Sequence, residues 1–179
     1  VIGPTGLKTQ GGFARFSQDG SMYFLSGNSG ANVFVFDFDR CTGLLSNLRE
    51  IPIPTDNVDG LWGISISPNS RYLYVNSSSR IFQYDLKSID ISASQQIVAN
   101  YDGYVCSFPP NPQTFGQSGF YWSQIGPDNK IYICSFGGGT NVYHVIDYPD
   151  SAGLACHVRQ HGVVFPTFMD FSIPNFPNY

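Results

Sequence analysis

One short pattern recurs four times in this sequence and limits the folds that the chain can adopt. Each copy is an apolar residue followed by Ser or Gly and then by a turn. The copies begin at Phe16, Ile66, Ile125 and Phe171, so they are 50, 59 and 46 residues apart. Such spacing predicts one supersecondary unit repeated along the chain.

The residues around the first three copies predict four short strands per repeat. Each copy is followed at once by β-forming residues, at 22–25, 72–75 and 131–134. Pro, Asp, Asn and Gly between these segments indicate antiparallel hairpins. A further strand ends on an Asp that can cap the next turn, at 33–37, 81–85 and 142–147. Weaker fourth strands are visible at 49–53, 95–98 and 157–160.

Four strands repeated at this interval are typical of β-propeller blades, which recur at roughly 40–50 residues. We therefore predict an all-β fold with three complete blades at about 10–55, 60–100 and 118–163. The fourth copy supplies only a closing strand at 166–176, the inner strand of a fourth blade. Because an unpaired strand is a liability, we expect other polypeptide, upstream of Val1, to complete a larger ring.

Composition narrows the classes of function. Aromatic residues make up 16% of the chain and charged residues only 12%, which favours half-buried strands over amphipathic helices. The net charge of -4 and the lack of a basic stripe argue against nucleic acid. No apolar run is long enough for a spanning helix, so we expect no direct membrane insertion. The four Cys contain no CxxC pair, which disfavours zinc.

Several stretches resemble a known family. In chain order, these stretches are residues 12–20, 36–47, 66–75, 83–86, 126–133 and 173–176. These resemble the exported surface β-propeller proteins of Bacteroidota that carry type IX secretion sorting domains. The resemblance implies the C-terminal half of a WD-type or quinoprotein-like ring in a secreted or outer-membrane surface protein. It also implies partners among other proteins, including components of the secretion or gliding machinery, but it transfers no catalytic residue.

The polar residues do not form a catalytic or metal site that can be recognised from the sequence. His144 falls within a third strand, and His157 and His161 lie on or beside an outer strand, whereas metal sites need convergent ligands. Asp19, Asn69 and Asp128 each stand alone in a hairpin, where capping the turn explains them better than calcium does. We therefore predict no enzyme, no metal and no cofactor.

Aromatic side chains are the candidates for binding. The segment 101–119 is rich in Tyr, Phe and Pro, and rigid exposed aromatics are common in protein and sugar recognition. Trp62 and Trp122 precede or begin inner strands. The alternative is that these rings pack between blades. The predicted binding residues are Tyr101, Tyr104, Phe108, Phe115, Trp62 and Trp122.

Export would permit disulfides. In a propeller, the loop before an innermost strand shares a face with the loop after the second strand. Cys106 and Cys134 occupy these two places, so we predict that they pair.

The leading hypothesis is a non-catalytic cell-surface or secreted module for protein or glycan contact. The alternative is a propeller enzyme of the lactonase or glycan-lyase kind whose catalytic residues lie mainly in the other half of the ring. Convergent carboxylates or His at the mouth of the ring would favour the enzyme, and an aromatic mouth the binder.

Overall fold

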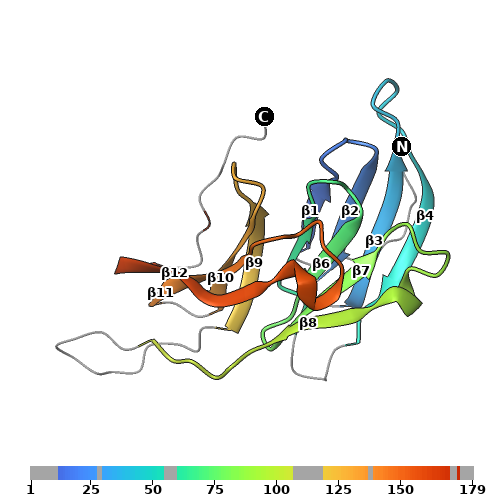
Figure 1. Ribbon diagram of the computed structural model, residues 1–179. Helices are drawn as coiled ribbons and strands as arrows, with labels where there is room; N and C mark the ends of the chain where they lie inside the picture. The colour runs from blue at the N-terminus through green and yellow to red at the C-terminus, as the bar shows by residue number, and fades with distance from the viewer. Residues whose placement is uncertain are drawn as a thin grey trace.

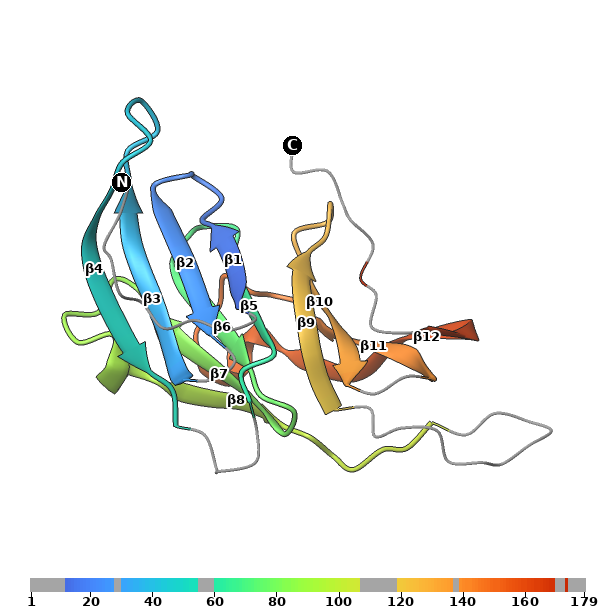
Figure 2. The same ribbon diagram turned by 180° about the vertical axis from the view of Figure 1, so that it is seen from behind.

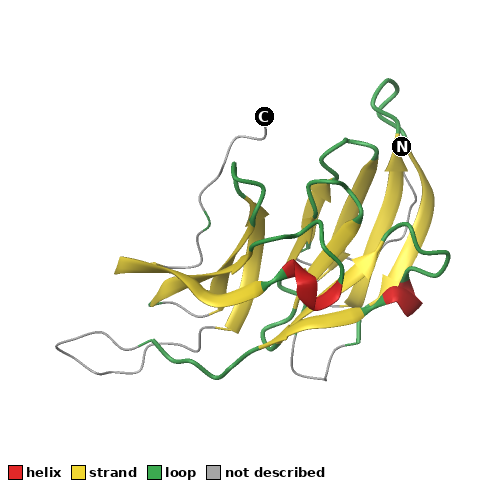
Figure 3. Cartoon of the chain, in the orientation of Figure 1, coloured by secondary structure: helices red, strands yellow, loops and turns green. Residues whose placement is uncertain are grey.

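The computed structural model describes residues 12–27, 30–54, 60–106, 119–136, 139–169 and 173. The regular structure in these residues is nearly all strand, with two short 3-10 helices, η1 (Ser92–Ser94) and η2 (Gly153–Cys156) (Figure 3). The strands form three four-stranded antiparallel sheets, as the repeat predicts. The all-β propeller prediction is confirmed. No helix in this part of the chain is long or apolar enough to cross a membrane.

Each sheet is one blade, with its strands paired in chain order. Blade 1 consists of β1 (Phe13–Phe16), β2 (Met22–Gly27), β3 (Gly30–Phe38) and β4 (Leu45–Pro52). Blade 2 consists of β5 (Gly63–Ile66), β6 (Tyr72–Asn76), β7 (Arg80–Asp85) and β8 (Gln96–Asn100). Blade 3 consists of β9 (Gly119–Ile125), β10 (Ile131–Phe136), β11 (Thr140–Ile146) and β12 (Val158–Met169). The three sheets stand side by side like a fan (Figure 1).

The repeated pattern forms the hairpin between the first two strands of each blade. In blade 1, Ser17 Oγ donates to Asp19 Oδ1 (2.6 Å) and accepts from Met22 N (2.9 Å). Blade 2 repeats this arrangement, because Ser67 Oγ donates to Asn69 Oδ1 at 2.7 Å. In blade 3 the Ser is replaced by Gly126, where a Cβ would lie 2.6 Å from the ring of Tyr132. The turn residues therefore satisfy their own backbone, as expected of Ser, Asp and Asn in turns.

The central blade is buried on both faces. Within β6, Leu73 and Val75 join the core against blade 1, whereas Tyr72 and Tyr74 join the core against blade 3. Successive side chains of a strand point to opposite faces, so this alternation fills two interfaces with one strand. All five residues of β6 are consequently buried.

One predicted boundary differs from the structure. We expected 166–176 to form a closing strand, but Thr140 of β11 pairs with Met169, so residues up to 169 belong to the outer strand β12. Strand β12 has twelve residues and its partner β11 has seven. Two register shifts accommodate the extra residues of β12, so it stays paired with β11 as far as Met169. Of the rest of the predicted segment, only Ile173 is among the described residues.

Candidate functional site

The innermost strands of the three blades converge on a small polar pocket. Strand β5 contacts both β1 and β9, and Figure 2 shows the three strands next to one another. The pocket has a volume of about 60 Å³ and is lined by Arg15, Phe16, Gln18, Ser65, Ile66, Gln124 and Ile125. One water molecule needs about 10–15 Å³ of pocket volume, so the pocket has room for roughly four to six water molecules. This inner pocket therefore suits a compact polar group.

The pocket is built from one position of the repeat. Arg15, Ser65 and Gln124 each stand directly before the leading apolar residue of their copy, at the end of an inner strand. Repetition of the blade therefore places three polar side chains at the same level of the ring. Next to them, Ser65 Oγ donates to Ser123 Oγ at 2.8 Å, which joins blade 2 to blade 3.

Arg15 is the charged residue of this pocket. Its side chain is half-buried, and Nη2 donates to the carbonyl oxygen of Ser123 at 3.2 Å, across to blade 3. Burial lowers the pKa of the guanidinium from its ordinary value, yet an arginine stays protonated in proteins. The pocket therefore carries a positive charge.

No carboxylate neutralises Arg15 within the described residues. The ion pairs there involve other cations, among them Arg49 with Asp37, Arg71 with Asp85, and Lys130 with Asp147. A partly buried charge without a counterion is unfavourable, and a bound anion would compensate it. Among the described residues, the other two nitrogens of the guanidinium have no acceptor, and their planar geometry matches phosphate and carboxylate oxygens.

The chemistry that the inner pocket can supply is binding and orientation. Its seven lining residues offer a guanidinium, side-chain amides and a hydroxyl, and none of them is a His, Asp or Glu that could act as general base. A reaction at this place would therefore take its base from elsewhere in the complete ring.

The two predicted tryptophans lie near the inner strands. The ring of Trp122 stacks on Tyr121 with centroids 5.2 Å apart and meets Phe13 edge-on at 5.8 Å. Trp62 lies 5.3 Å from the same Tyr121. These contacts place the rings between blades, although Trp122 keeps 37% of its surface exposed. A binding role for Trp62 and Trp122 stays a prediction.

The predicted tyrosines belong to a separate cluster at the far end of blade 2. Tyr101 meets Phe120 edge-on at 6.4 Å, and its hydroxyl donates to the carbonyl oxygen of Tyr104. Tyr104 in turn stacks on His161 of β12 at 4.2 Å. The structure thus does not bring Tyr101 and Tyr104 together with the tryptophans. Phe108 and Phe115 lie outside the described residues.

The predicted disulfide is wrong, because Cys106 and Cys134 are both free thiols. Cys134 lies in β10, where it interacts with Tyr121 and Trp122 of the neighbouring strand β9, whereas Cys106 lies beyond the end of β8. Burial raises the pKa of the Cys134 thiol to about 12. Such a thiol is unreactive and acts as a small apolar side chain.

Three solved structures share the fold. A protein of Bacteroides fragilis that is provisionally named 6-phosphogluconolactonase superposes with a TM-score of 0.55 and 18% identity, over 87% of this chain and 39% of that chain. A Bacteroides uniformis protein with the same provisional name gives 0.54 and 20%, over 87% and 40%. A Lactobacillus plantarum protein gives 0.54 and 16%, over 87% and 42%. Neither a family model nor a curated protein matches the sequence.

These likenesses show the fold alone, since all identities are below 25%. The chain spans about two fifths of the length of each of these proteins. They nevertheless contradict our expectation that the chain belongs to no enzyme, because two proteins built on the same fold are named as enzymes. The non-catalytic hypothesis had rested on the lack of a legible catalytic motif, and a site assembled from several blades leaves no such motif in one segment.

The inner pocket is not among the sites predicted from the sequence. The signal was present, because Arg15, Ser65 and Gln124 occupy equivalent positions of the repeat, one residue before each leading apolar residue. In each of the three blades, the residue directly before the leading apolar residue is polar and lies near the end of the inner strand. Alignment of the copies by this position would have brought the three together.

Proposed function

We propose that this chain is part of a propeller enzyme that opens the lactone ring of an anionic sugar acid, and that the inner pocket binds the anionic group of the substrate. The observation that carries the proposal is Arg15, a half-buried guanidinium without a carboxylate partner among the described residues, at the convergence of three inner strands. The shared fold with proteins named 6-phosphogluconolactonases supports the choice of reaction.

The pocket suits a phosphate or carboxylate group. Two free nitrogens of Arg15 can donate to two anion oxygens at once, and the amides of Gln18 and Gln124 line the same space. In the reaction, water adds to the lactone carbonyl carbon and the ring C–O bond breaks; one proton of the water goes to the ring oxygen, which becomes a hydroxyl group, and the other is released to solvent as the new acid ionises to a carboxylate. Arg15 would hold the remote phosphate so that the ring reaches the catalytic groups of other blades.

Binding of the reaction product separates this role from catalysis. Isothermal titration calorimetry with 6-phosphogluconate should show one site, and Arg15→Ala should weaken it roughly 10- to 100-fold, because a hydrogen-bonded charge contributes about 1.5–3 kcal/mol. With 6-phosphogluconolactone as substrate, the same variant should raise KM more than it lowers kcat.

Arg49→Ala is the matched control. Arg49 lies on the outer strand of blade 1, where it is paired with Asp37 of the neighbouring strand. It should bind 6-phosphogluconate as the wild type does. Equal affinity of wild type and Arg15→Ala would refute the anion site, and a full-length protein that binds 6-phosphogluconate but does not accelerate lactone opening would refute the reaction.

We further propose that the protein is exported to the cell surface and works beside other proteins of the outer membrane. The support is the resemblance of its hairpin stretches to exported Bacteroidota propellers. Protease treatment of intact cells, followed by immunoblotting, should degrade the protein without lysis. Protection until lysis would argue against this location.

A further inference from the structure

A second and larger pocket lies between blade 2 and the loop that leads into η2 of blade 3. Its volume is about 350 Å³, at the lower end of the range of small-molecule sites. The lining is polar for the most part and comes from two blades. It consists of Arg71, Tyr72, Gln83, Asp85, Ser88, Ala93, Ser94, Gln95, Gln96 and Ala152.

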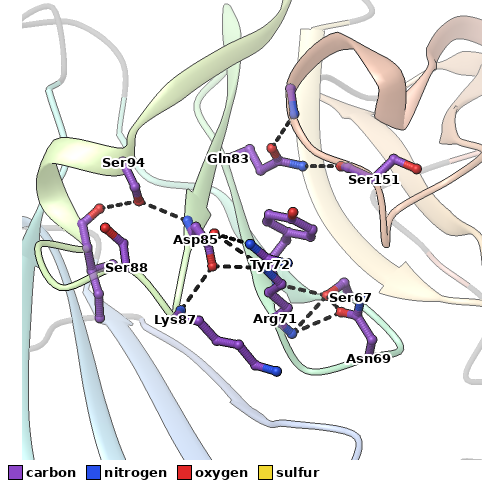
Figure 4. A network of polar contacts seen from close by, with 12 residues as sticks. Ser67, Asn69, Arg71, Tyr72, Gln83, Asp85, Lys87, Ser88, Ser94 and Ser151 are labelled. Carbon is purple, nitrogen blue, oxygen red and sulfur yellow. Dashed lines mark hydrogen bonds and ion pairs between the residues drawn. The ribbon is translucent and has the colours of Figure 1, made fainter.

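An ion pair forms one wall of this outer pocket. Arg71 Nε and Nη2 donate to the carboxylate of Asp85, the latter at 2.8 Å, and the guanidinium lies 5.2 Å above the ring of Tyr72 (Figure 4). Asp85 also accepts from the backbone N–H of Lys87, and its own N–H donates to Ser94 Oγ. This wall is thus fixed in place and has no net charge.

Gln83 fixes the side of the pocket that is formed by the loop at Ala152. Its Nε2 donates to Tyr74 Oη (2.7 Å) and to the carbonyl oxygen of Ser151 (2.8 Å), while Oε1 accepts from the N–H of Gly153 (2.6 Å). Figure 4 shows Gln83 reaching from its strand to this loop. Because these bonds hold the Ala152 loop against blade 2, the pocket is formed before any ligand binds.

Several polar groups of the pocket have no hydrogen-bond partner in the part of the chain that the structure describes. The side-chain amides of Gln95 and Gln96 and the Nη1 of Arg71 make no hydrogen bond within the described residues. Gly153 leaves the space that the Gln96 amide occupies, since a Cβ there would lie 2.3 Å from Oε1. Ser88 Oγ donates to a backbone carbonyl and keeps its acceptor capacity. Unused donors and acceptors therefore line the same space.

We propose that the outer pocket binds a neutral sugar unit. Each sugar hydroxyl both donates and accepts, which matches two free amides, a serine hydroxyl and one guanidinium N–H. An anion would meet the carboxylate of Asp85, whose pairing with Arg71 removes the net positive charge that an anion requires. An apolar ligand would leave the amides unpaired. The same hydroxyl chemistry is offered by a free monosaccharide and by the terminal unit of a glycan chain.

Ligand-observed NMR on the full chain tests this inference. Glucose, galactose, mannose and N-acetylglucosamine are tested, each also as its methyl glycoside and as a disaccharide. At least one should give a saturation-transfer signal and a Kd in the millimolar range. Binding of the free sugar but not of its glycoside or disaccharide assigns a free monosaccharide, and equal or tighter binding of the disaccharide assigns a glycan end. No signal from any of these sugars would overturn the proposal.

Two kinds of variant locate the bound sugar. Ala93→Trp fills the pocket, and the double variant Gln95→Ala with Gln96→Ala removes the unused amides. Each should weaken binding at least tenfold. Ile89→Trp is the control for the first, because Ile89 is fully exposed on the same loop and outside the pocket, and Ser92→Ala is the control for the second.

Urea unfolding of each variant checks that the fold is retained. The amides of Gln95 and Gln96 hold nothing together within the described residues, so their removal should leave the unfolding midpoint unchanged. Unaltered sugar binding by Ala93→Trp, or equal loss in Ala93→Trp and Ile89→Trp, would overturn the assignment to this pocket. Binding of 6-phosphogluconate should be the same in all these variants, which separates this result from the fate of the inner pocket.

Discussion

The two pockets differ in how an arginine is neutralised. In the inner pocket Arg15 has a single backbone acceptor and no carboxylate among the described residues, whereas in the outer pocket Arg71 is held by both oxygens of Asp85. The inner pocket is therefore positive, and the outer pocket is neutral. The same residue type thus prepares one site for an anion and another for an uncharged polar ligand, and the counterion decides which.

A counterion for Arg15 should have the largest effect on the difference between the two pockets. Gln124→Glu changes an amide of the inner pocket to a carboxylate of the same shape. It should lower the affinity for 6-phosphogluconate about 100-fold, because the carboxylate both pairs with Arg15 and repels the ligand. Calorimetry measures the effect. Gln124→Ala, which adds no charge, should cost only a few-fold, and an equal loss in both variants would count against charge as the cause.

The converse change removes the counterion of Arg71. Asp85→Asn in an Arg15→Ala background should create anion binding at the outer pocket, with an affinity for 6-phosphogluconate roughly tenfold above that of Arg15→Ala alone, since one charge-assisted hydrogen bond is gained. Phosphorus NMR titration follows the ligand. Asp37→Asn frees Arg49 in the same way but outside either pocket, so it should gain nothing. A gain in that control would show that any unpaired surface arginine suffices.

The salt concentration should affect the two pockets differently in the unmutated protein. An increase from about 0.05 to 0.5 M NaCl should weaken 6-phosphogluconate binding several-fold, because screening acts on the attraction between the anion and Arg15. Binding of the neutral sugar at the outer pocket should stay constant. Parallel titrations of the two ligands over the same salt series measure this. A sugar affinity that falls with salt as steeply as the anion affinity would contradict a neutral outer pocket.

The smallest effect is the pH dependence of the Arg71–Asp85 pair. Hydrogen bonds from Arg71 lower the pKa of Asp85 below its ordinary value of about 3.9. A lowered pKa in the folded state gives stability that is present above the unfolded pKa and is lost as the pH falls through the folded pKa. The difference in urea midpoint between wild type and Asp85→Asn should therefore be present at pH 7 and shrink below about pH 4. A constant difference down to pH 2 would show that the charge of Asp85 does not matter.

The blades could be predicted from the sequence because their information is local. The turn residues after Phe16, Ile66 and Ile125 specify hairpins, and β-forming residues follow at fixed distances. The terminal aspartates of the third strands were expected to cap turns by themselves. Asp85 does accept from the backbone of Lys87, but Asp147 instead holds Lys130, His157 and Arg159. Arg159 lies in β12, Lys130 directly before β10 and His157 directly before β12, and strand patterns cannot predict contacts between such separate segments.

The pockets could be predicted only in part. Arg15 occupies a recognisable position of the repeat, but the lack of a carboxylate beside it depends on how three blades converge. The outer pocket depends on Gln83 reaching a loop some seventy residues away, at Ser151 and Gly153. The predicted pairing of Cys106 with Cys134 failed for a similar reason, since Cys134 lies within β10 of blade 3 and Cys106 lies beyond the end of β8 of blade 2, and a strand pattern does not give the distance between two sulfurs.

The hydrogen bond from Arg15 to Ser123 joins blade 1 to blade 3, with blade 2 between them. Its length therefore depends on the angles between the three blades. If the three sheets moved apart, the distance between the donor on β1 and the acceptor on β9 would increase, because these strands belong to blades 1 and 3. An anion bound in the inner pocket would oppose this separation. Anion binding and close packing of the three blades are therefore thermodynamically linked. A ligand bound in the inner pocket should therefore slow amide hydrogen exchange in the inner strands of all three blades.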